Sequence, residues 1–327
     1  MKKNLFYFLA TVLLSASVVT GLTACGDDDD DEGGGSSSTT AGVIDAKSGL
    51  RIKGVGNYNY YYTDDGRIDY ISDRYGKWTF GYNPNTITFV ETYNGRTSKE
   101  ETVAVSYNKA GYLAGINYNE TKEYSDGDEW TTTGKSSLSY DGSGHLTKIS
   151  SSANSQGKEG GKNYTEKWSD DIALTWKNNQ LQKIVWVESG TENGESWKST
   201  ETWNFSYGTD YENPYCQWAP SIAKPLDDDI IELMAYAGLL GKGPSMLPDG
   251  CEYEDVYVED GDTDRNESTK TYRYDYNDDG SISSTTINST RYSFYYDYNS
   301  TRANDGATPK TAPAKKLKSL FMHARRR

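Results

Sequence analysis

The chain of 327 residues has only two histidines, His145 and His323. Histidine is the side chain that most often acts as a general base near neutral pH, and a Ser-His-Asp hydrolase requires one beside a serine and an acid. His145 lies within a hairpin-turn pattern and His323 within a basic tail, and Cys216 has no histidine placed to activate it. We therefore expect no catalytic residue, no cofactor, and a protein that is not an enzyme.

Cysteine is equally scarce, with Cys25, Cys216 and Cys251 as the only three. In an exported protein the last two meet oxidising conditions, so a disulfide between Cys216 and Cys251 is chemically allowed. It would close a loop of roughly 35 residues and stabilise the fold by about 3–4 kcal/mol. The sequence leaves open whether the two cysteines lie close enough to pair.

Long hydrophobic runs are confined to the N-terminus. Lys2 and Lys3 precede a charge-free apolar stretch from Leu5 to Leu22, the pattern of a secretory signal. A retained transmembrane helix is the alternative, because the stretch is almost the ~20 residues that span a bilayer.

The end of this stretch decides between the two. Leu22-Thr23-Ala24-Cys25 resembles the lipobox of bacterial lipoproteins, which implies removal of residues 1–24 and attachment of diacylglycerol and a further acyl chain to Cys25. Each buried CH₂ contributes about 0.8 kcal/mol, so two or three chains anchor the protein to its membrane.

Residues 25–42 form an acidic Gly/Ser tether that cannot build a core. Its acids, Asp27 to Glu32, resemble the surface-export signal of lipoproteins from Gram-negative gut anaerobes. We expect a lipid-anchored outer-membrane protein displayed on the cell surface rather than on the periplasmic face.

Acidic residues outnumber basic ones by 48 to 34, and the net charge is −14. Removing residues 1–24 takes away two lysines and no acid, which leaves −16. Such a field repels phosphate backbones, so we expect no nucleic-acid partner. Residues 301–327 are the exception, a basic segment that we expect to be disordered; the alternative is that it lies on the acidic body or on lipid phosphates.

Helix-favouring runs of leucine and alanine are nearly absent, whereas there are 28 tyrosines and 8 tryptophans. Apolar and polar residues alternate with a period of two along 164–176, 197–207 and 102–107. Asn-Gly and Asp-Gly pairs separate such runs and predict tight hairpins. We predict an all-β domain over residues 43–300, an antiparallel meander of roughly 14 strands that forms a soluble barrel-like sheet.

A repeat runs through this domain. The pattern Tyr-x-x-x-Gly-x-Leu/Ile-x-x-Ile starts at Tyr62, Tyr107 and Tyr140, and shorter versions start at Trp176 and Tyr276. The spacing of the two aliphatic residues would place them on opposite faces of a regular strand, so either a bulge intervenes or both faces are partly covered.

One insertion breaks the strand pattern. Within residues 213–250 we predict a helix near 228–240, because Ile230, Leu233, Met234 and Ala237 share one face. Asp227 or Asp228 would cap it, and Gly241 or Gly243 would end it. The apolar face predicts a static plug at one end of the barrel; a mobile lid is the alternative.

The repeat, the insertion ending in Gly-Lys-Gly-Pro (241–244) and Leu-Pro-Asp-Gly (247–250), and the anchored N-terminus together resemble a lipoprotein family of unknown function with a porin-like fold. The repeat alone also resembles the tyrosine-aspartate repeats of bacterial toxins. The resemblance implies a meandering barrel and no activity. A lipid-embedded barrel needs an aliphatic outer face, but here Glu166, Asp170 and Glu201 share the apolar faces, so we expect these faces to point inward.

Metal and ligand signals are weak. Asp275, Asn277 and Asp279 match the start of a calcium loop, but Thr286 replaces the final glutamate, and a hairpin turn explains them as well. Trp78, Trp130 and Trp218 could stack on sugars or simply fill the barrel. We predict a non-enzymatic envelope protein that binds a glycan or glycoconjugate. The alternatives are a structural or assembly partner of another outer-membrane protein and a carboxylate-dependent glycoside hydrolase.

Overall fold

The computed structural model describes residues 50–298, apart from 94–95, 124–128, 160–161, 193, 227–228 and 260–261. The signal segment 1–24, Cys25, the tether and the tail 301–327 lie outside the described residues, so their predictions stay predictions. The same holds for the proposed caps Asp227 and Asp228.

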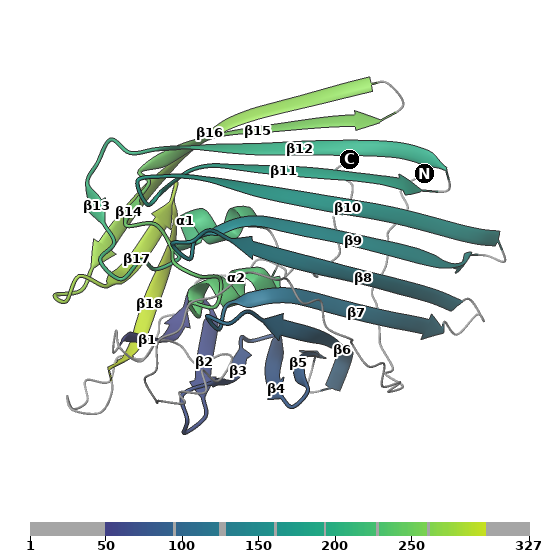
Figure 1. Ribbon diagram of the computed structural model, residues 1–327, viewed down its shortest axis with the longest axis horizontal. Helices are drawn as coiled ribbons and strands as arrows, with labels where there is room; N and C mark the ends of the chain where they lie inside the picture. Colours follow the sequence, from purple (N-terminus) through teal and green to yellow (C-terminus); the bar gives the residue numbers. More distant parts are fainter. Residues whose placement is uncertain are drawn as a thin grey trace, which may run out of the picture.

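The described chain is almost entirely β-structure (Figure 1). The strands of its first half are β1 (Leu50–Val55), β2 (Tyr58–Tyr62), β3 (Ile68–Ser72), β4 (Gly76–Tyr82), β5 (Asn85–Tyr93), β6 (Arg96–Tyr107), β7 (Leu113–Glu123), β8 (Glu129–Tyr140) and β9 (Leu146–Glu159). The second half contains β10 (Lys162–Lys177), β11 (Gln180–Glu192), β12 (Glu195–Ser206), β13 (Tyr211–Glu212), β14 (Met246–Leu247), β15 (Gly250–Glu259), β16 (Asp262–Tyr276), β17 (Ile282–Ile287) and β18 (Thr290–Tyr298). Its helices are α1 (Pro220–Ala223), the 3-10 turn η2 (Lys224–Leu226) and α2 (Asp229–Tyr236).

Sixteen of these strands form a closed antiparallel barrel in which chain neighbours pair. β1 pairs with β18 to close it, and β12 pairs with β15 because β13, β14 and the helices are inserted between them. The predicted all-β meander is confirmed. The predicted strand number is slightly low, since several turns lack the Asn-Gly or Asp-Gly signal: β10–β11 turns at Asn178 and Asn179, and β17–β18 at Asn288, all with positive φ.

The apolar faces point into the barrel, as predicted. Along β10, Tyr164, Ile172 and Leu174 are buried, while the alternate positions Thr165, Asp171 and Thr175 are exposed. The outer face therefore carries hydroxyl and charged groups instead of the aliphatic band that hydrocarbon requires.

The repeat forms one end of the barrel, which we call the repeat end. Its glycines adopt positive φ, for example Gly66 at 86° and Gly144 at 87°. In each repeat the register shifts at the aromatic residue, as at Ser139/Tyr140 in the β8–β9 pair. A bulge thus intervenes, and it turns both aliphatic residues inward: Leu146 is 0% and Ile149 3% exposed.

The bulged aromatics also connect neighbouring hairpins. The Tyr140 hydroxyl donates to the Leu113 carbonyl at 2.6 Å, and the Trp176 indole donates to the Leu146 carbonyl at 2.7 Å. Equivalent bonds of 2.7 Å run from Tyr62 to Ile52, Tyr82 to Ile68, Tyr207 to Leu181 and Tyr296 to Ile282. The aromatic residues of the repeat therefore join neighbouring hairpins by hydrogen bonds at the rim of the barrel.

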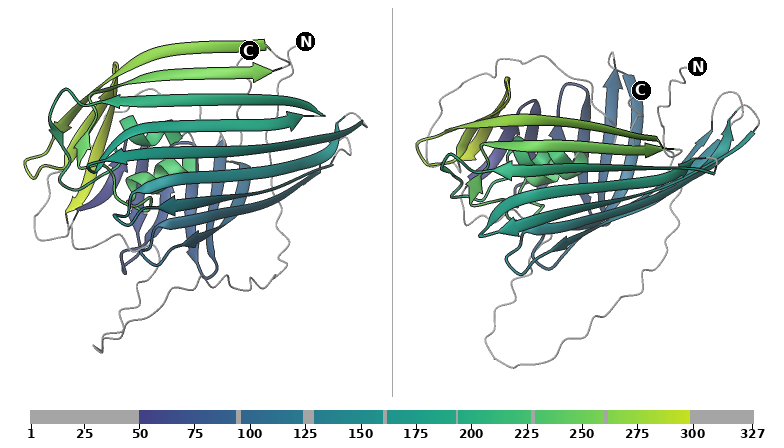
Figure 2. Two further views of the ribbon diagram at one scale, coloured as in Figure 1. Left: turned by 45° about the horizontal axis from the view of Figure 1, so that its top comes forward. Right: turned by 90° about the horizontal axis from the view of Figure 1, so that it is seen from above.

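The inserted helices occupy the barrel interior at the repeat end (Figures 1 and 2). Residues 230–237 are all buried, so α2 is covered on every side and not on one stripe only. Tyr60 of β2 donates to the Leu233 carbonyl at 3.1 Å, and Lys224 pairs with Glu232 at 2.9 Å. This enclosure supports the static plug.

The helix α2 ends earlier than predicted. Gly238 has a φ of 76°, and the Leu239 amide donates to the Met234 carbonyl at 2.8 Å, which is a Schellman ending. The predicted terminators lie farther on, where Gly241 bridges His145 of the β8–β9 turn.

Strands of unequal length make the barrel lopsided. Strands β7–β12, β15 and β16 extend well beyond the helices and form what we call the long wall (Figures 1 and 2). Within the described residues, β7 pairs with β6 only over 113–117, and β16 pairs with β17 only from Tyr272 onward. The long wall therefore has two free edges away from the repeat end, and its inner face extends past the plug.

Candidate functional site

Cys216 and Cys251, which the sequence left open as a possible disulfide, are not bonded to each other. Cys216 and Cys251 are both free thiols. Cys251 is 2% exposed in β15 and accepts a hydrogen bond from the Tyr272 hydroxyl at 3.0 Å, while Cys216 lies in the loop before α1, where the Gly243 amide donates to its carbonyl. Burial raises the pKa of both thiols, which makes them poor nucleophiles.

The weak metal candidates lie at the end of β16, where Asp275 is, and in the turn to β17, where Asn277 and Asp279 are. Asp279 accepts hydrogen bonds from the Ser281 amide and hydroxyl at 2.9 and 2.7 Å, and Asp275 pairs with Arg291 at 2.9 Å. Asn277 donates to the Ser281 hydroxyl at 2.8 Å. These contacts explain the residues as a hairpin, and the part of the chain that the structure describes has no group of three or more His, Cys, Asp or Glu side chains suited to a metal.

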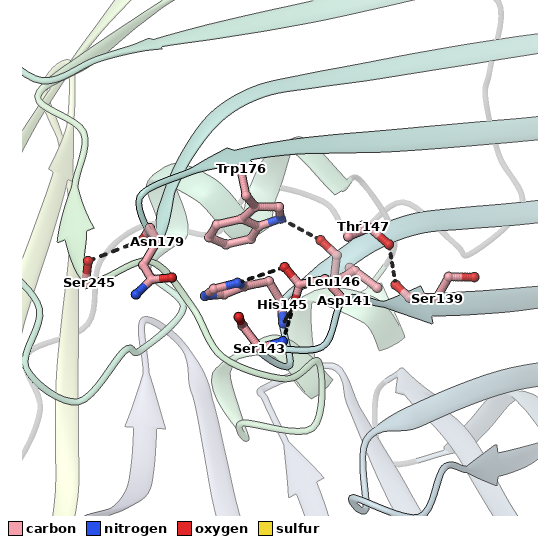
Figure 3. Close-up of polar contacts among 9 residues, drawn as sticks. All are labelled: Ser139, Asp141, Ser143, His145, Leu146, Thr147, Trp176, Asn179 and Ser245. Atoms are coloured by element: carbon pink, nitrogen blue, oxygen red, sulfur yellow. Dashed lines mark hydrogen bonds and ion pairs between the residues drawn. The ribbon is translucent and has the colours of Figure 1, made fainter. Parts of the chain in front are cut away.

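His145 forms the most conspicuous acid–imidazole pair (Figure 3). Its Nδ1 lies 3.1 Å from Asp141 Oδ2, and its ring stacks on Trp176 with centroids 4.4 Å apart. Asp141 Oδ1 also accepts the backbone amides of Ser143 and His145 at 2.9 Å. Because His145 is only 4% exposed, a substrate cannot reach its ring, and the pair holds the turn against the plug.

A different set of residues stands out on the inner face of the long wall. Successive strands place side chains directly opposite one another there: Tyr118, Gly134, Ala153, Trp168, Gly190 and Trp197, from β7 to β12. We call this set the aromatic row. With a strand spacing of about 4.8 Å it extends roughly 24 Å across the wall.

The small members of the aromatic row determine how its rings lie. A Cβ at Gly134 would overlap the ring of Tyr118, and a Cβ at Gly190 would come within 2.6 Å of the ring of Trp197. The rings of Tyr118 and Trp197 therefore lie flat over glycines of the neighbouring strand. Trp168 and Trp197 are half-buried, so part of each is open to solvent.

Polar rows flank the aromatic row on both sides. Toward the repeat end, Ser136, Ser151, Asp170, Glu188 and Ser199 stand opposite one another, with the two serine hydroxyls of β8 and β9 2.9 Å apart. Toward the free end, Thr132 and Ser155 hydrogen-bond at 2.9 Å beside Glu166 and Glu192. Tyr118, Thr132, Ser155 and Glu188 are at most 9% exposed and so form the buried part of this face. The half-buried residues Trp168, Trp197, Glu166, Asp170, Glu192 and Ser199 form a surface that can stack a ring and bond its hydroxyl groups.

Asp170 is a carboxyl of this surface whose pKa is strongly raised. Its pKa is raised to about 7, chiefly by burial; the nearby Trp186 indole lowers this pKa, and the adjacent Asp171 carboxylate raises it. A carboxyl with such a pKa is partly protonated near neutral pH, and it can then donate as well as accept a hydrogen bond.

Sequence reasoning did not find the aromatic row. Of the tryptophans singled out as sugar platforms, Trp78 is 2% exposed and packs against Phe89, while Trp218 is 1% exposed and donates to the Gly241 carbonyl at 3.1 Å. Both fill the interior, and the Trp130 side chain lies outside the described residues. The signal that could have found the row is cross-strand: a glycine opposite each aromatic becomes visible only once the hairpin registers are fixed.

No protein-family model and no curated protein sequence matches the chain. Among solved structures, the chain is similar to a porin-like protein from Bacteroides vulgatus ATCC 8482, with 12% identity, a TM-score of 0.46, and coverage of 76% of this chain and 99% of that one. It is also similar to a porin-like protein from Bacteroides uniformis ATCC 8492, with 16% identity, a TM-score of 0.31, and coverage of 73% and 90%. Over the described residues, no helix reaches the length and apolarity that a membrane span needs.

Proposed function

We propose that the protein is a lipid-anchored, non-enzymatic envelope protein that binds a glycan through the aromatic row of its long wall. The observation that carries the proposal is the row itself, in which flat rings alternate with small residues between two rows of hydroxyls and carboxylates. Sugars present apolar ring faces and hydroxyl edges, so this alternation suits them.

The positions of the two chain ends support an orientation in which the long wall points away from the membrane. Leu50 pairs with Tyr298, so both ends of the described chain leave the barrel at the repeat end. About 25 residues join Cys25 to Leu50, and a Gly/Ser-rich random coil of that length would have a root-mean-square span of roughly 25–30 Å. An anchor on Cys25 would therefore hold the plugged end nearest the membrane and leave the long wall pointing outward.

A glycan array probed with the mature chain, residues 25–327, tests the proposal. The expected result is binding to one group of glycans that is lost in the double variant Trp168→Ala/Trp197→Ala. Tyr61→Ala is the matched control, because Tyr61 is an aromatic ring 43% exposed outside the row. Absence of binding to every glycan, or equal loss in the control variant, would refute the proposal.

A carboxylate-dependent glycoside hydrolase is the second candidate, because Asp170 stands opposite Glu188 on neighbouring strands and its pKa is raised to about 7. Retaining glycosidases use two carboxyls about 5 Å apart, one of them protonated. Release of reducing ends from a bound glycan, abolished by Asp170→Asn, would replace the binding protein with this enzyme.

A further inference from the structure

The two faces of the long wall differ in the sign of their charges. Inward-facing carboxylates occur on every strand from β10 to β12 and on β15 and β16; they are Glu166, Asp170, Glu188, Glu192, Glu195, Glu201, Asp255, Glu259, Asp262 and Asp264. Among the described inward side chains of β8–β12, β15 and β16, the single basic group is Lys270, and its ammonium lies 4.8 Å from the centre of the Tyr253 ring.

The outward face carries mainly basic side chains. Its basic residues are Lys135, Lys148, Lys158, Lys167, Lys177, Lys183, Lys198, Arg265 and Arg273. Two of them are paired with outward acids, in Lys148–Asp171 at 2.9 Å and Arg265–Glu254 at 2.7 Å. The described outward acids of the same strands are Asp171, Glu252, Glu254, Glu267 and Asp275. The outer face thus carries a small excess of positive charge, whereas the inner face has a large excess of negative charge.

This excess of negative charge destabilises the inner face. Like charges on neighbouring strands repel, and a wall that excludes water from one side strengthens that repulsion. Glu166 stands opposite Glu192, and Glu201 stands opposite Asp255, so acids face acids directly. A cation bound between them would relieve this repulsion, and a polyanion would increase it.

From this charge segregation we propose that the glycan is one that carries protonated amines, a deacetylated amino-sugar chain, and that the long wall rejects glycans built from uronic acids. The inference rests on the proposed function, since the aromatic row supplies the stacking surface. Trp168 and Trp197 lie two strands apart with acid rows on both sides, so a sugar stacked on either ring places its amine near a carboxylate.

Three hexasaccharides of similar size separate charge from stacking: a chitosan hexamer with free amines, chitohexaose with the amines acetylated, and a galacturonic acid hexamer. At about pH 6, where amines carry protons, titration calorimetry on the mature chain should give the highest affinity for the chitosan hexamer, a lower one for chitohexaose and the lowest for the galacturonic acid hexamer. We expect the dissociation constant to rise at least roughly tenfold from each hexasaccharide to the next. Raising the salt concentration should weaken the chitosan hexamer more than chitohexaose, because only the former binds through charge.

The acid rows are tested directly by Glu166→Gln/Glu188→Gln. This variant should lose most of the preference for the amine form and keep the affinity for chitohexaose. Asp171→Asn is the matched control; Asp171 is exposed on the opposite face of β10, and its removal should leave the preference unchanged.

Equal affinity for the chitosan hexamer and chitohexaose would overturn the charge inference and leave glycan binding intact, and so would tight binding of the galacturonic acid hexamer. Binding of a lysine-rich peptide as tight as that of the chitosan hexamer, unaffected by Trp168→Ala/Trp197→Ala, would show a surface for cationic peptides and overturn the glycan as occupant. Failure of every glycan on the array would instead refute the proposed function.

Discussion

The clearest consequence of the buried acid concerns stability and pH. Asp170 has a pKa of about 7 in the folded protein because burial disfavours its charged form; in the unfolded chain an aspartate titrates near pH 4. The folded state therefore holds the proton more tightly, and its stability falls as pH rises from about 4 to about 7. Between about pH 5 and pH 8 the loss from this one group is about 2–3 kcal/mol, since each pKa unit corresponds to about 1.4 kcal/mol.

Asp170→Asn removes this dependence. The amide resembles the protonated carboxyl in shape and never ionises, so the variant should match the native protein at about pH 5 and exceed its free energy of unfolding by about 2–3 kcal/mol at about pH 8. Urea unfolding followed by tryptophan fluorescence at several pH values measures the difference. The matched control is Asp275→Asn, because that carboxylate is exposed, paired with Arg291 at 2.9 Å and not among the groups that shift the pKa of Asp170. A variant with the native pH slope, or one less stable at pH 8, would refute the burial argument.

Three further substitutions test the repeat end and the plug. Tyr140→Phe removes the 2.6 Å bond to the rim and should lower the free energy of unfolding by about 1 kcal/mol; no change would show that the rim bonds do not stabilise the barrel. Glu232→Ala leaves the ammonium of Lys224 without its 2.9 Å partner in the plug and should cost about 2–4 kcal/mol by chemical denaturation; a neutral result would contradict a tightly packed plug. His145→Ala removes a buried ring stacked on an indole and should lower the melting temperature while leaving glycan affinity unchanged; loss of binding with an intact fold would give His145 a functional role.

Local signals in the sequence were enough for the fold class and for much of the topology. The alternation along β10 predicted its buried face, and the repeat predicted hairpins whose aliphatic residues required a bulge. The helix was located because Ile230 and Leu233 lie on one face, although its burial on every side follows from enclosure by the barrel, which local periodicity cannot express.

Local sequence signals could not locate the candidate site, because the residues that form it come from different strands. Trp168 and Trp197 are brought to one row only by the registers of β10 with β11 and of β11 with β12. Gly190 is an ordinary strand glycine in the sequence, and its role appears only when the ring of Trp197 lies over it. The same is true of the inner acids, because the face that each acid occupies is known only once the barrel has closed.

The central claim is that ligand binds on the inner face of the long wall, and neighbouring residues of one strand can test it. Ser151 of β9 belongs to the inner polar row, whereas Ser152 points outward. In a background with Cys25→Ser, Cys216→Ser and Cys251→Ser, the single variants Ser151→Cys and Ser152→Cys are labelled with a maleimide in the presence and absence of the chitosan hexamer. Bound ligand should slow labelling at position 151 severalfold and leave labelling at position 152 unchanged. Protection of position 152 alone, or of neither position under conditions where the hexamer is bound, would contradict the central claim.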